Sequence, residues 1–193
     1  MDHENSVSQQ ETRSEKKRNF IVNSYEWVEA LISSLIAVIV VFMFLFRVVN
    51  VSGPSMLPTL RSNDRVILSS FFYKPHQGDV IVITHTTKLK EPIIKRVVAL
   101  ENQVVDIDFE TGVVSVDGAA LDESAYIENG ITTQLSDFNY PLQVPKGHVF
   151  VLGDNRSVSN DSRFIDVGMV DERYILGKAE MIVFPFNRFG TIK

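Results

Sequence analysis

The most prominent pattern in the chain is an uninterrupted apolar run near its N-terminus. Residues 30–46 read ALISSLIAVIVVFMFLF and carry no charge. A helix of this length, extended by its flanks to residues 25–47, is long enough to cross a hydrocarbon core about 30 Å thick. Tyr25 and Trp27 are aromatic residues of the kind found at a membrane interface, and Arg47 can extend its side chain to the other interface. The pattern predicts one transmembrane helix.

Two other interpretations of the apolar run fit less well. A buried core helix would also be apolar, but the polar tail, residues 1–24, that precedes the run favours a membrane anchor. A cleavable signal peptide would end in a small-x-small site, which is absent from Arg47-Val-Val-Asn after the run. Basic residues are more numerous before the run than shortly after it, which places the tail in the cytoplasm. Those before it are Arg13, Lys16, Lys17 and Arg18, and those after it are Arg47, Arg61 and Arg65.

The remainder of the chain, residues 48–193, consists of short β-branched runs separated by turn signals. Runs of this kind are typical of strands. Asp117-Gly118 lies between two apolar stretches and favours a tight type I′ hairpin. The pattern predicts a mainly β, antiparallel extracytoplasmic domain in which residues 102–145 form a smaller, loop-rich inserted region. The predicted strands begin near Arg65, Asp79, Ile93, Gln103, Val113, His148 and Met181.

Composition narrows the chemistry that this domain can use. The 193 residues are 45% hydrophobic and 22% charged, which is enough apolar material for a folded core. The absence of cysteine removes disulfides, zinc-thiolate sites and cysteine nucleophiles. We therefore expect no metal and no cofactor. The formal net charge of -5, without a dense basic block, argues against nucleic acid as a partner.

The first of three segments with candidate chemistry closely follows the apolar run. Residues 52–59 read SGPSMLPT. Pro54 and Pro58 restrict their own backbone angles and those of the residues before them, so Ser55 lies on a stiff loop. Such positioning suits a nucleophile, although an ordinary proline-rich turn with exposed serines would have the same sequence.

The second segment contains a lysine in an apolar setting. On a strand, Lys95 shares its face with Ile93 and Val97, whereas Arg96 points the other way. Apolar neighbours remove water from the ammonium group and lower its pKa. To act as a base near neutral pH, Lys95 needs a pKa shift of roughly 3 units, which costs about 4 kcal/mol. The alternative is an edge-strand lysine whose ammonium reaches water.

The third segment follows the apolar run Val149-Phe150-Val151-Leu152. Residues 153–163 read GDNRSVSNDSR, with serines and two Arg and Asp pairs. Such a sequence is typical of a hydrogen-bonded loop that supports a site, or of a well-capped surface turn.

In this order and spacing, the three segments resemble the type I signal peptidases of bacteria. Residues 53–59 resemble the family's G-x-S-M-x-P-T box, Lys95-Arg96 the box that supplies a lysine, and residues 153–163 the G-D-N…D-S-R box. A single apolar run and a short insertion are similar to the Gram-positive form. Further matching boxes are Gly78-Asp79-Val80, Gly177-Lys178-Ala179 and Phe184-Pro185.

The resemblance implies a serine endopeptidase with a Ser-Lys dyad that removes signal peptides from exported preproteins. Ser55 is then the nucleophile and Lys95 the general base, and the reaction passes through an acyl-enzyme. Ser159 is expected to hydrogen-bond the lysine and orient it. Asp154 is expected to pair with Arg96 as a scaffold.

Gly53 is a departure from part of the family. Some members have a hydroxyl residue two positions before the nucleophile, where it helps to stabilise the oxyanion. With Gly53 at that position, we expect the oxyanion to be held mainly by the backbone N–H of Ser55, with a second donor still to be identified.

Substrate recognition is predicted from the extended segment that leads into the nucleophile loop. If a substrate strand pairs with Val49-Asn50-Val51, its side chains at the first and third positions before the cut point toward the protein. Shallow apolar pockets there would admit Ala, which predicts cleavage after a small-x-small sequence. The expected partners are secretory preproteins and membrane lipid. The candidate substrate-binding residues are Val49, Val51, Met56 and Ile94, with Ile93 as an alternative to Ile94.

Three other functions are compatible with parts of the sequence. A Ser-His-Asp hydrolase could use Ser55, Asp154 and either His85 or His148, but the histidines form no cluster in the sequence. An anchored assembly factor could keep the fold without chemistry, but the presence of both Ser55 and Lys95 argues against it. A self-cleaving regulator with a related Ser-Lys core needs a DNA-binding module, whereas here an apolar run occupies the N-terminal part.

Overall fold

The computed structural model describes residues 24–42, 46–127 and 132–192. The chain forms two compact units, Met1–Phe44 and Leu45–Lys193. In the first unit the described part is a helix over Ser24–Phe42, which is long and apolar enough to cross a membrane. The predicted polar tail, residues 1–24, lies almost wholly outside the described residues.

The predicted end of the membrane helix is corrected by the structure. The sequence predicts a helix over residues 25–47, but Phe46 and Arg47 already belong to strand β1 (Phe46–Asn50). They pair with Ser69 and Leu68 of strand β2 (Arg65–Ser69). The sequence is apolar on both sides of the boundary between the helix and β1, so hydrophobicity alone does not show where the helix ends. Backbone pairing of Phe46 and Arg47 with β2 determines the start of the strand.

The second unit confirms the predicted mainly β, antiparallel fold. Within its described residues, the larger sheet has the order β1-β2-β11-β3-β4-β9-β10, and β12 pairs with β11. Adjacent strands run antiparallel. Its other strands are β3 (Val80–Ile83), β4 (Ile93–Ala99), β9 (His148–Leu152), β10 (Val170–Asp171), β11 (Ile175–Phe184) and β12 (Gly190–Thr191). Short 3₁₀ helices, η1 (Glu172–Tyr174) and η2 (Phe186–Arg188), lie before and after β11.

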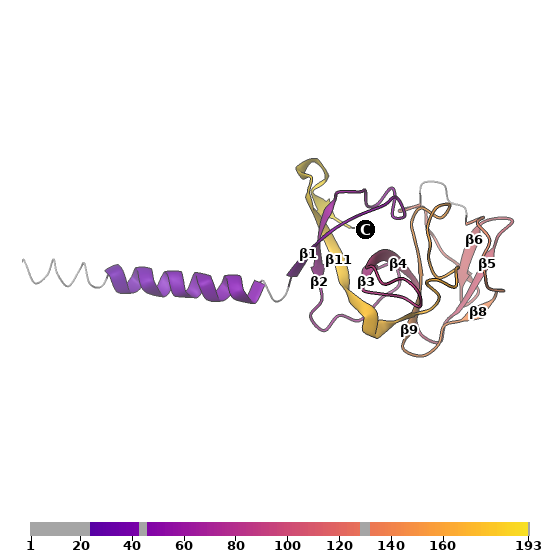
Figure 1. The fold of residues 1–193 in the computed structure, drawn as a ribbon, viewed down its shortest axis with the longest axis horizontal. Coiled ribbons are helices and arrows are strands. Elements are labelled where there is room, and N and C mark those ends of the chain that lie inside the picture. The colour runs from indigo at the N-terminus through magenta and orange to yellow at the C-terminus, as the bar shows by residue number, and fades with distance from the viewer. Residues whose placement is uncertain (1–23, 43–45, 128–131, 193) are drawn as a thin grey trace, which may run out of the picture. The chain divides into compact units, whose positions relative to one another are not determined.

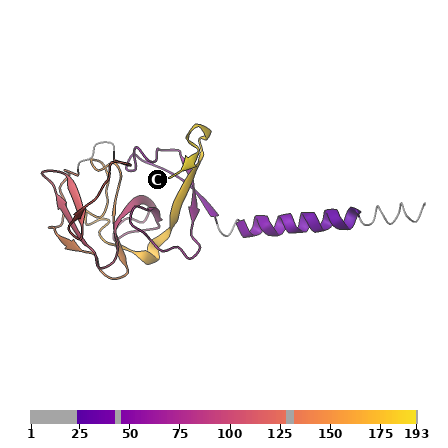
Figure 2. The same ribbon diagram turned by 180° about the vertical axis from the view of Figure 1, so that it is seen from behind.

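A smaller antiparallel sheet is formed by the stretch between β4 and β9. Its order is β7-β6-β5-β8. Figures 1 and 2 show this sheet beyond β9, on the side away from β1 and β2. Asp117 and Gly118 join β6 to β7 with φ values of 52° and 81°, which confirms the predicted type I′ turn. The strands are β5 (Val104–Asp108), β6 (Val113–Val116), β7 (Ala119–Ala120) and β8 (Leu142–Gln143).

The central strands of the larger sheet are buried on both faces. In β3, Val80 and Val82 pack into one hydrophobic cluster, whereas Ile81 and Ile83 pack into another on the opposite face. A strand covered on both sides needs apolar residues at every position, which explains the unbroken Val-Ile-Val-Ile run. Strand β4 lies between β3 and β9, so Lys95 is in the interior of the sheet.

Candidate active site

The candidate nucleophile lies on a loop between β1 and β2 that is fixed by backbone bonds and by the core. The Val51 N–H donates to the Asp64 carbonyl at 2.8 Å, and the Leu60 N–H donates to the Met56 carbonyl at 2.8 Å. Met56 and Leu60 are buried in a hydrophobic cluster and anchor the loop. Ser55 is half-buried between these anchors. The loop is therefore an ordered support for its hydroxyl.

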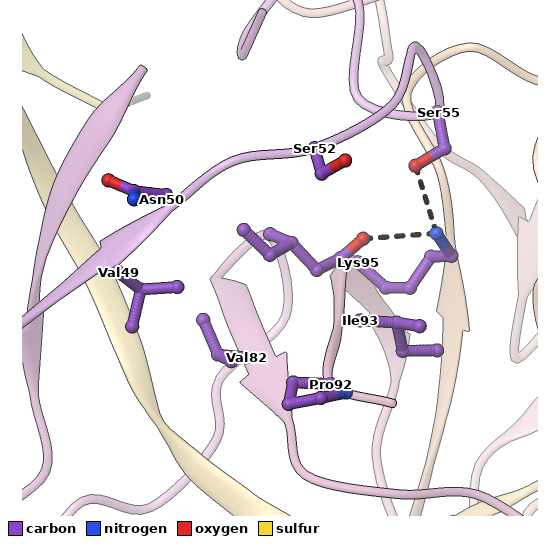
Figure 3. A pocket seen from close by; sticks show the side chains of 9 residues that line it. Val49, Asn50, Ser52, Ser55, Val82, Pro92, Ile93 and Lys95 are labelled. Atoms are coloured by element: carbon purple, nitrogen blue, oxygen red, sulfur yellow. Dashed lines mark hydrogen bonds between the residues drawn. The ribbon is translucent and has the colours of Figure 1, made fainter. Parts of the chain in front are cut away.

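Lys95 reaches this hydroxyl from strand β4. Its Nζ donates to Ser55 Oγ at 3.1 Å and to the Ile94 carbonyl at 3.1 Å. Figure 3 shows the ammonium end between these two oxygens. Lys95 is only 3% exposed, so the alternative of a solvent-exposed edge-strand lysine is wrong. A nucleophile within hydrogen-bonding distance of a base is the arrangement that acyl transfer requires.

The electrostatic surroundings favour a neutral lysine. Burial lowers the pKa of Lys95 to about 8 because it destabilises the charged ammonium form. Asp161 and Asp154 oppose this effect and raise the pKa, whereas Arg163 lowers it further. Both carboxylates are themselves in buried ion pairs, Asp154 with Arg96 and Asp161 with Arg163. A useful fraction of Lys95 is therefore neutral only slightly above pH 7.

A buried hydrogen-bonded cluster joins the three functional segments. Arg96 lies next to Lys95 on β4 and donates to both carboxylate oxygens of Asp154, at 2.8 and 2.7 Å. The Thr59 hydroxyl, from the nucleophile loop, donates to the same carboxylate at 2.5 Å. The Tyr126 ring covers the guanidinium, whose carbon is 4.0 Å from the ring centroid. The expected pairing of Asp154 with Arg96 is present, and Thr59 extends it to the loop that carries Ser55.

The turn after β9 contacts the backbone of the nucleophile. The Asn155 N–H donates to the Ser55 carbonyl at 3.0 Å, and the Asn155 side-chain amide donates to the Pro54 carbonyl at 3.2 Å. Gly153 is required for this close approach, because a Cβ at that position would lie 2.2 Å from Ser159 Oγ and 2.6 Å from the Ser55 carbonyl oxygen. This turn therefore fixes the backbone of the nucleophile loop at Pro54 and Ser55.

Ser159 lies close to the dyad but does not make the expected contact. Its side chain is buried, and its Oγ has no hydrogen-bond partner among the described residues. The hydrogen bond to Lys95 that the resemblance implies is thus absent from this structure. The physical reason is that Lys95 Nζ is directed to Ser55 Oγ and the Ile94 carbonyl instead.

An apolar pocket of about 280 Å³ opens beside the dyad. Figure 3 shows Val49, Val82, Pro92 and Ile93 around it, with Ser55 and Lys95 at one end. The aliphatic part of its wall suits apolar substrate side chains. Val49 and Ile94 were predicted to line such a pocket, and both do. The complete lining is Val49, Asn50, Ser52, Ser55, Val82, Pro92, Ile93, Ile94 and Lys95.

Three predicted site residues have a different place from the one expected. Val51 and Met56 were predicted to contact substrate, but they are 5% and 2% exposed and belong to the core. Alternation does place Val51 on the face of Val49, but the chain turns inward after β1, where the Asn63 N–H bonds the Val51 carbonyl. Gly53 has a φ of 88°, which favours glycine, and its N–H donates to Ser62 Oγ at 2.8 Å. That N–H is engaged within the loop and does not support an oxyanion.

The histidines proposed for a Ser-His-Asp site lie elsewhere. The His85 ring packs on Tyr174 with centroids 3.8 Å apart, and His148 Nδ1 is 3.0 Å from the Lys146 carbonyl. Neither lines the pocket that contains Ser55, so this interpretation is wrong. Among the described residues, no three His, Cys, Asp or Glu side chains are grouped so as to hold a metal ion.

Several contributing residues were missed in the sequence. Val82 could have been found, because a β3–β4 hairpin places it opposite Ile94. Pro92 and Ser52 could be suspected from their positions next to the two functional segments. Thr59 and Asn155 act through contacts between distant segments, for which the sequence offers no signal beyond their place in the matching boxes.

Comparisons with known proteins agree with this geometry. A family model described as "Signal peptidase, peptidase S26" matches residues 24–184. Signal peptidase I P of Bacillus subtilis subsp. natto is 32% identical over 186 residues, covering 92% of this chain and 96% of the relative. Signal peptidase I of Bacillus licheniformis is 31% identical over 189 residues, covering 92% and 96%. The probable signal peptidase I-1 of Synechocystis sp. (strain ATCC 27184 / PCC 6803 / Kazusa) is 33% identical over 178 residues, covering 86% of each chain. The chain therefore belongs to the signal peptidase family, peptidase S26.

Proposed function

We propose that this member of the signal peptidase family cleaves signal peptides from secretory preproteins with a Ser55–Lys95 dyad, through an acyl-enzyme. The observation that carries the proposal is the 3.1 Å hydrogen bond between Lys95 Nζ and Ser55 Oγ in a buried setting. Burial lowers the pKa of Lys95 to about 8, so the lysine can accept a proton near neutral pH.

The chemical steps follow from this contact. Neutral Lys95 takes the proton of Ser55 as Oγ attacks the scissile carbonyl, and the tetrahedral intermediate forms. The protonated lysine then donates to the leaving amine, which becomes the new N-terminus of the mature protein. Water hydrolyses the ester, again with Lys95 as base. The backbone N–H of Ser55 is the proposed oxyanion donor.

The pocket beside the dyad accounts for a small-x-small preference. Side chains at the first and third positions before the cut point to the same side of an extended substrate. Val49, Val82 and Ile93 are apolar walls of this pocket. We infer that the side chains at the first and third positions share it with the substrate backbone, so each meets only a shallow apolar site. Cleavage should therefore slow markedly when Leu replaces Ala at either position.

Membrane attachment is part of the same proposal. The Ser24–Phe42 helix is apolar enough to span a bilayer. The basic residues that precede it favour a cytoplasmic location for the N-terminal tail. The β domain, which follows the helix in sequence, is then extracytoplasmic. Protease added outside wall-stripped cells should digest this domain, and its protection would reverse the proposed orientation.

The decisive experiment is processing of a preprotein by the purified chain in detergent, with sequencing of the new N-terminus. Ser55→Ala and Lys95→Ala should each abolish cleavage, whereas His85→Ala and His148→Ala should cleave normally. A second series compares precursors with Ala, Ser, Val or Leu at the first and third positions, for wild type and Ile93→Ala. Normal turnover by either dyad variant would overturn the mechanism, and equal cleavage of Ala and Leu precursors would overturn the pocket assignment.

A further inference from the structure

A second surface depression of about 300 Å³ is lined in part by Ser159 and has no role in the steps above. It is formed by the insertion near residues 134–137 and by the loop after β9, residues 158–166. We call it the distal groove. Its lining residues are Gln134, Asp137, Val158, Ser159, Asn160, Phe164, Ile165 and Asp166, none of which lines the apolar pocket.

We propose that the distal groove binds the first residues of the mature segment, on the far side of the scissile bond from the apolar pocket. This inference rests on the proposed function, since an endopeptidase that acts on a precursor must hold chain on both sides of the bond. The occupant is an extended, neutral peptide segment of the substrate itself.

The position of the distal groove next to the nucleophile supports this assignment. The Asn155 N–H donates to the Ser55 carbonyl, and the Ser159 N–H donates to the Asn155 carbonyl at 3.1 Å. Ser159 lines the groove, and the space between its Oγ and the Ser55 carbonyl is too small for a Cβ on Gly153. A single hydrogen-bonded turn, residues 153–159, therefore links the nucleophile to the distal groove.

The β3–β4 hairpin contacts residues of both depressions. Pro92 and Ile93, at its end, line the apolar pocket. The Lys88 N–H and the Thr86 hydroxyl donate to the carbonyl of Asp166, a residue of the distal groove, at 3.1 and 2.8 Å. Both depressions thus border the same hairpin.

The walls of the distal groove are held in place before any ligand binds. The Asp137 N–H donates to the Arg163 carbonyl at 2.9 Å, and the Asp137 carboxylate accepts from the Ile165 N–H at 2.8 Å. The Ser136 hydroxyl donates to the same Arg163 carbonyl at 2.6 Å. These bonds join the insertion to the loop after β9, so binding costs little ordering of the protein.

The surface chemistry of the distal groove fits a neutral peptide. Val158 and Ile165 are 54% and 52% exposed, which leaves two aliphatic side chains for contact with a ligand. Asn160 supplies an amide that can bond an extended backbone. The Gln134 amide nitrogen donates to the Ser157 and Arg156 carbonyls, which leaves its carbonyl oxygen as an acceptor. Asp137 and Asp166 are the charged residues of the lining. Asp166 is paired with Lys88 at 2.9 Å, so Asp137 is the carboxylate expected to disfavour acidic substrate side chains.

The test compares two peptide substrates with the same signal-derived sequence, one ending a single residue after the scissile bond and the other extending four residues further. The full-length chain in detergent should cleave the longer one with a kcat/KM about tenfold higher, the scale set by burying an aliphatic side chain. Val158→Asp and Ile165→Asp should reduce this ratio to below about threefold. Phe72→Asp places the same charge on an exposed apolar residue of the β2–β3 connection and should keep the full ratio.

A measurement on wild type alone tests the proposal even if the variants fail to fold. Longer substrates with Leu at the second to fourth positions after the bond should be cleaved several-fold faster than those with Asp, because Leu can pack on Val158 and Ile165 and the Asp137 carboxylate disfavours an acid. A wild-type ratio near one, a ratio unchanged in both groove variants, or equal rates for Leu and Asp substrates would overturn the proposal. Any of these results with Ser55→Ala still inactive would leave the dyad mechanism intact, so the two failures are distinguishable.

Discussion

Replacing the buried lysine should stabilise the protein while it abolishes activity. Lys95 is 3% exposed, and burial lowers its pKa from 10.5 to about 8. At about 1.36 kcal/mol per pKa unit, this shift corresponds to about 3 kcal/mol that folding loses when the lysine is charged. Lys95→Met keeps the length of the side chain and removes the charge. The variant should therefore have the higher free energy of unfolding at neutral pH.

The stability difference between Lys95→Met and wild type should depend on pH, because the folded and unfolded states release the lysine proton at different pH values. Below pH 8 both the folded and the unfolded states bind the lysine proton, so the wild type bears the full cost. Between pH 8 and 10.5 the unfolded state alone keeps the proton, and wild-type stability rises with pH. At pH 7 the melting temperature of Lys95→Met should exceed that of wild type by about 6–12 °C, and at pH 9.5 by less than about half of that.

Thermal unfolding of the full chain in detergent, followed by near-ultraviolet circular dichroism at both pH values, measures these differences. Lys90→Met is the matched control, because Lys90 is an exposed lysine just before β4. It should shift the melting temperature little at either pH. The reasoning is refuted if Lys95→Met is less stable than wild type at pH 7, or if its advantage does not shrink as the pH rises.

The remaining predictions concern the pH profile of cleavage, the buried ion pair and one glycine. Because a lysine with a pKa of about 8 is about one-tenth neutral at pH 7, kcat/KM should rise about tenfold from pH 7 to a plateau above pH 9, and an acid optimum would exclude Lys95 as base. Asp154→Asn should lower the free energy of unfolding by about 3–5 kcal/mol in denaturant titrations, since it leaves a buried guanidinium without its counter-charge. Lys88→Met, which breaks an exposed pair, should cost less than about 1 kcal/mol. Gly153→Ala should abolish cleavage, because its Cβ would meet the Ser55 carbonyl at 2.6 Å, whereas Gly190→Ala, which has open space, should retain activity.

Patterns local to the sequence predicted the strands and the two reactive groups. The β-branched runs correspond to β2, β3, β4, β5, β6 and β9, because period and composition are local properties. Alternation on β4 also placed Lys95 among apolar neighbours, as the structure shows. The dyad was found through matching boxes, which supplied the pairing of Ser55 with Lys95 that spacing alone could not.

Contacts between distant segments account for what the sequence did not predict. Val51 is predicted to contact substrate if side chains keep alternating between the two faces past the end of β1. The chain instead turns into the core there. The expected hydrogen bond between Ser159 and Lys95 is absent. The direction of the lysine side chain depends on every oxygen within its reach, and Lys95 bonds the Ile94 carbonyl. The distal groove combines residues from the insertion and from the loop after β9, so no single sequence window contains it.

The buried arginines serve the chemistry as well as the fold. Asp161 and Asp154 raise the pKa of Lys95, so two unpaired carboxylates there would oppose the effect of burial. Arg163 lowers the lysine pKa directly, and it also holds Asp161 at 2.8 Å. Arg96 holds Asp154 in the same way from the position next to Lys95. Alternate residues of a strand face opposite sides. Strand β4 can therefore direct Lys95 toward Ser55 and the adjacent Arg96 toward Asp154, the carboxylate that would otherwise favour a charged lysine.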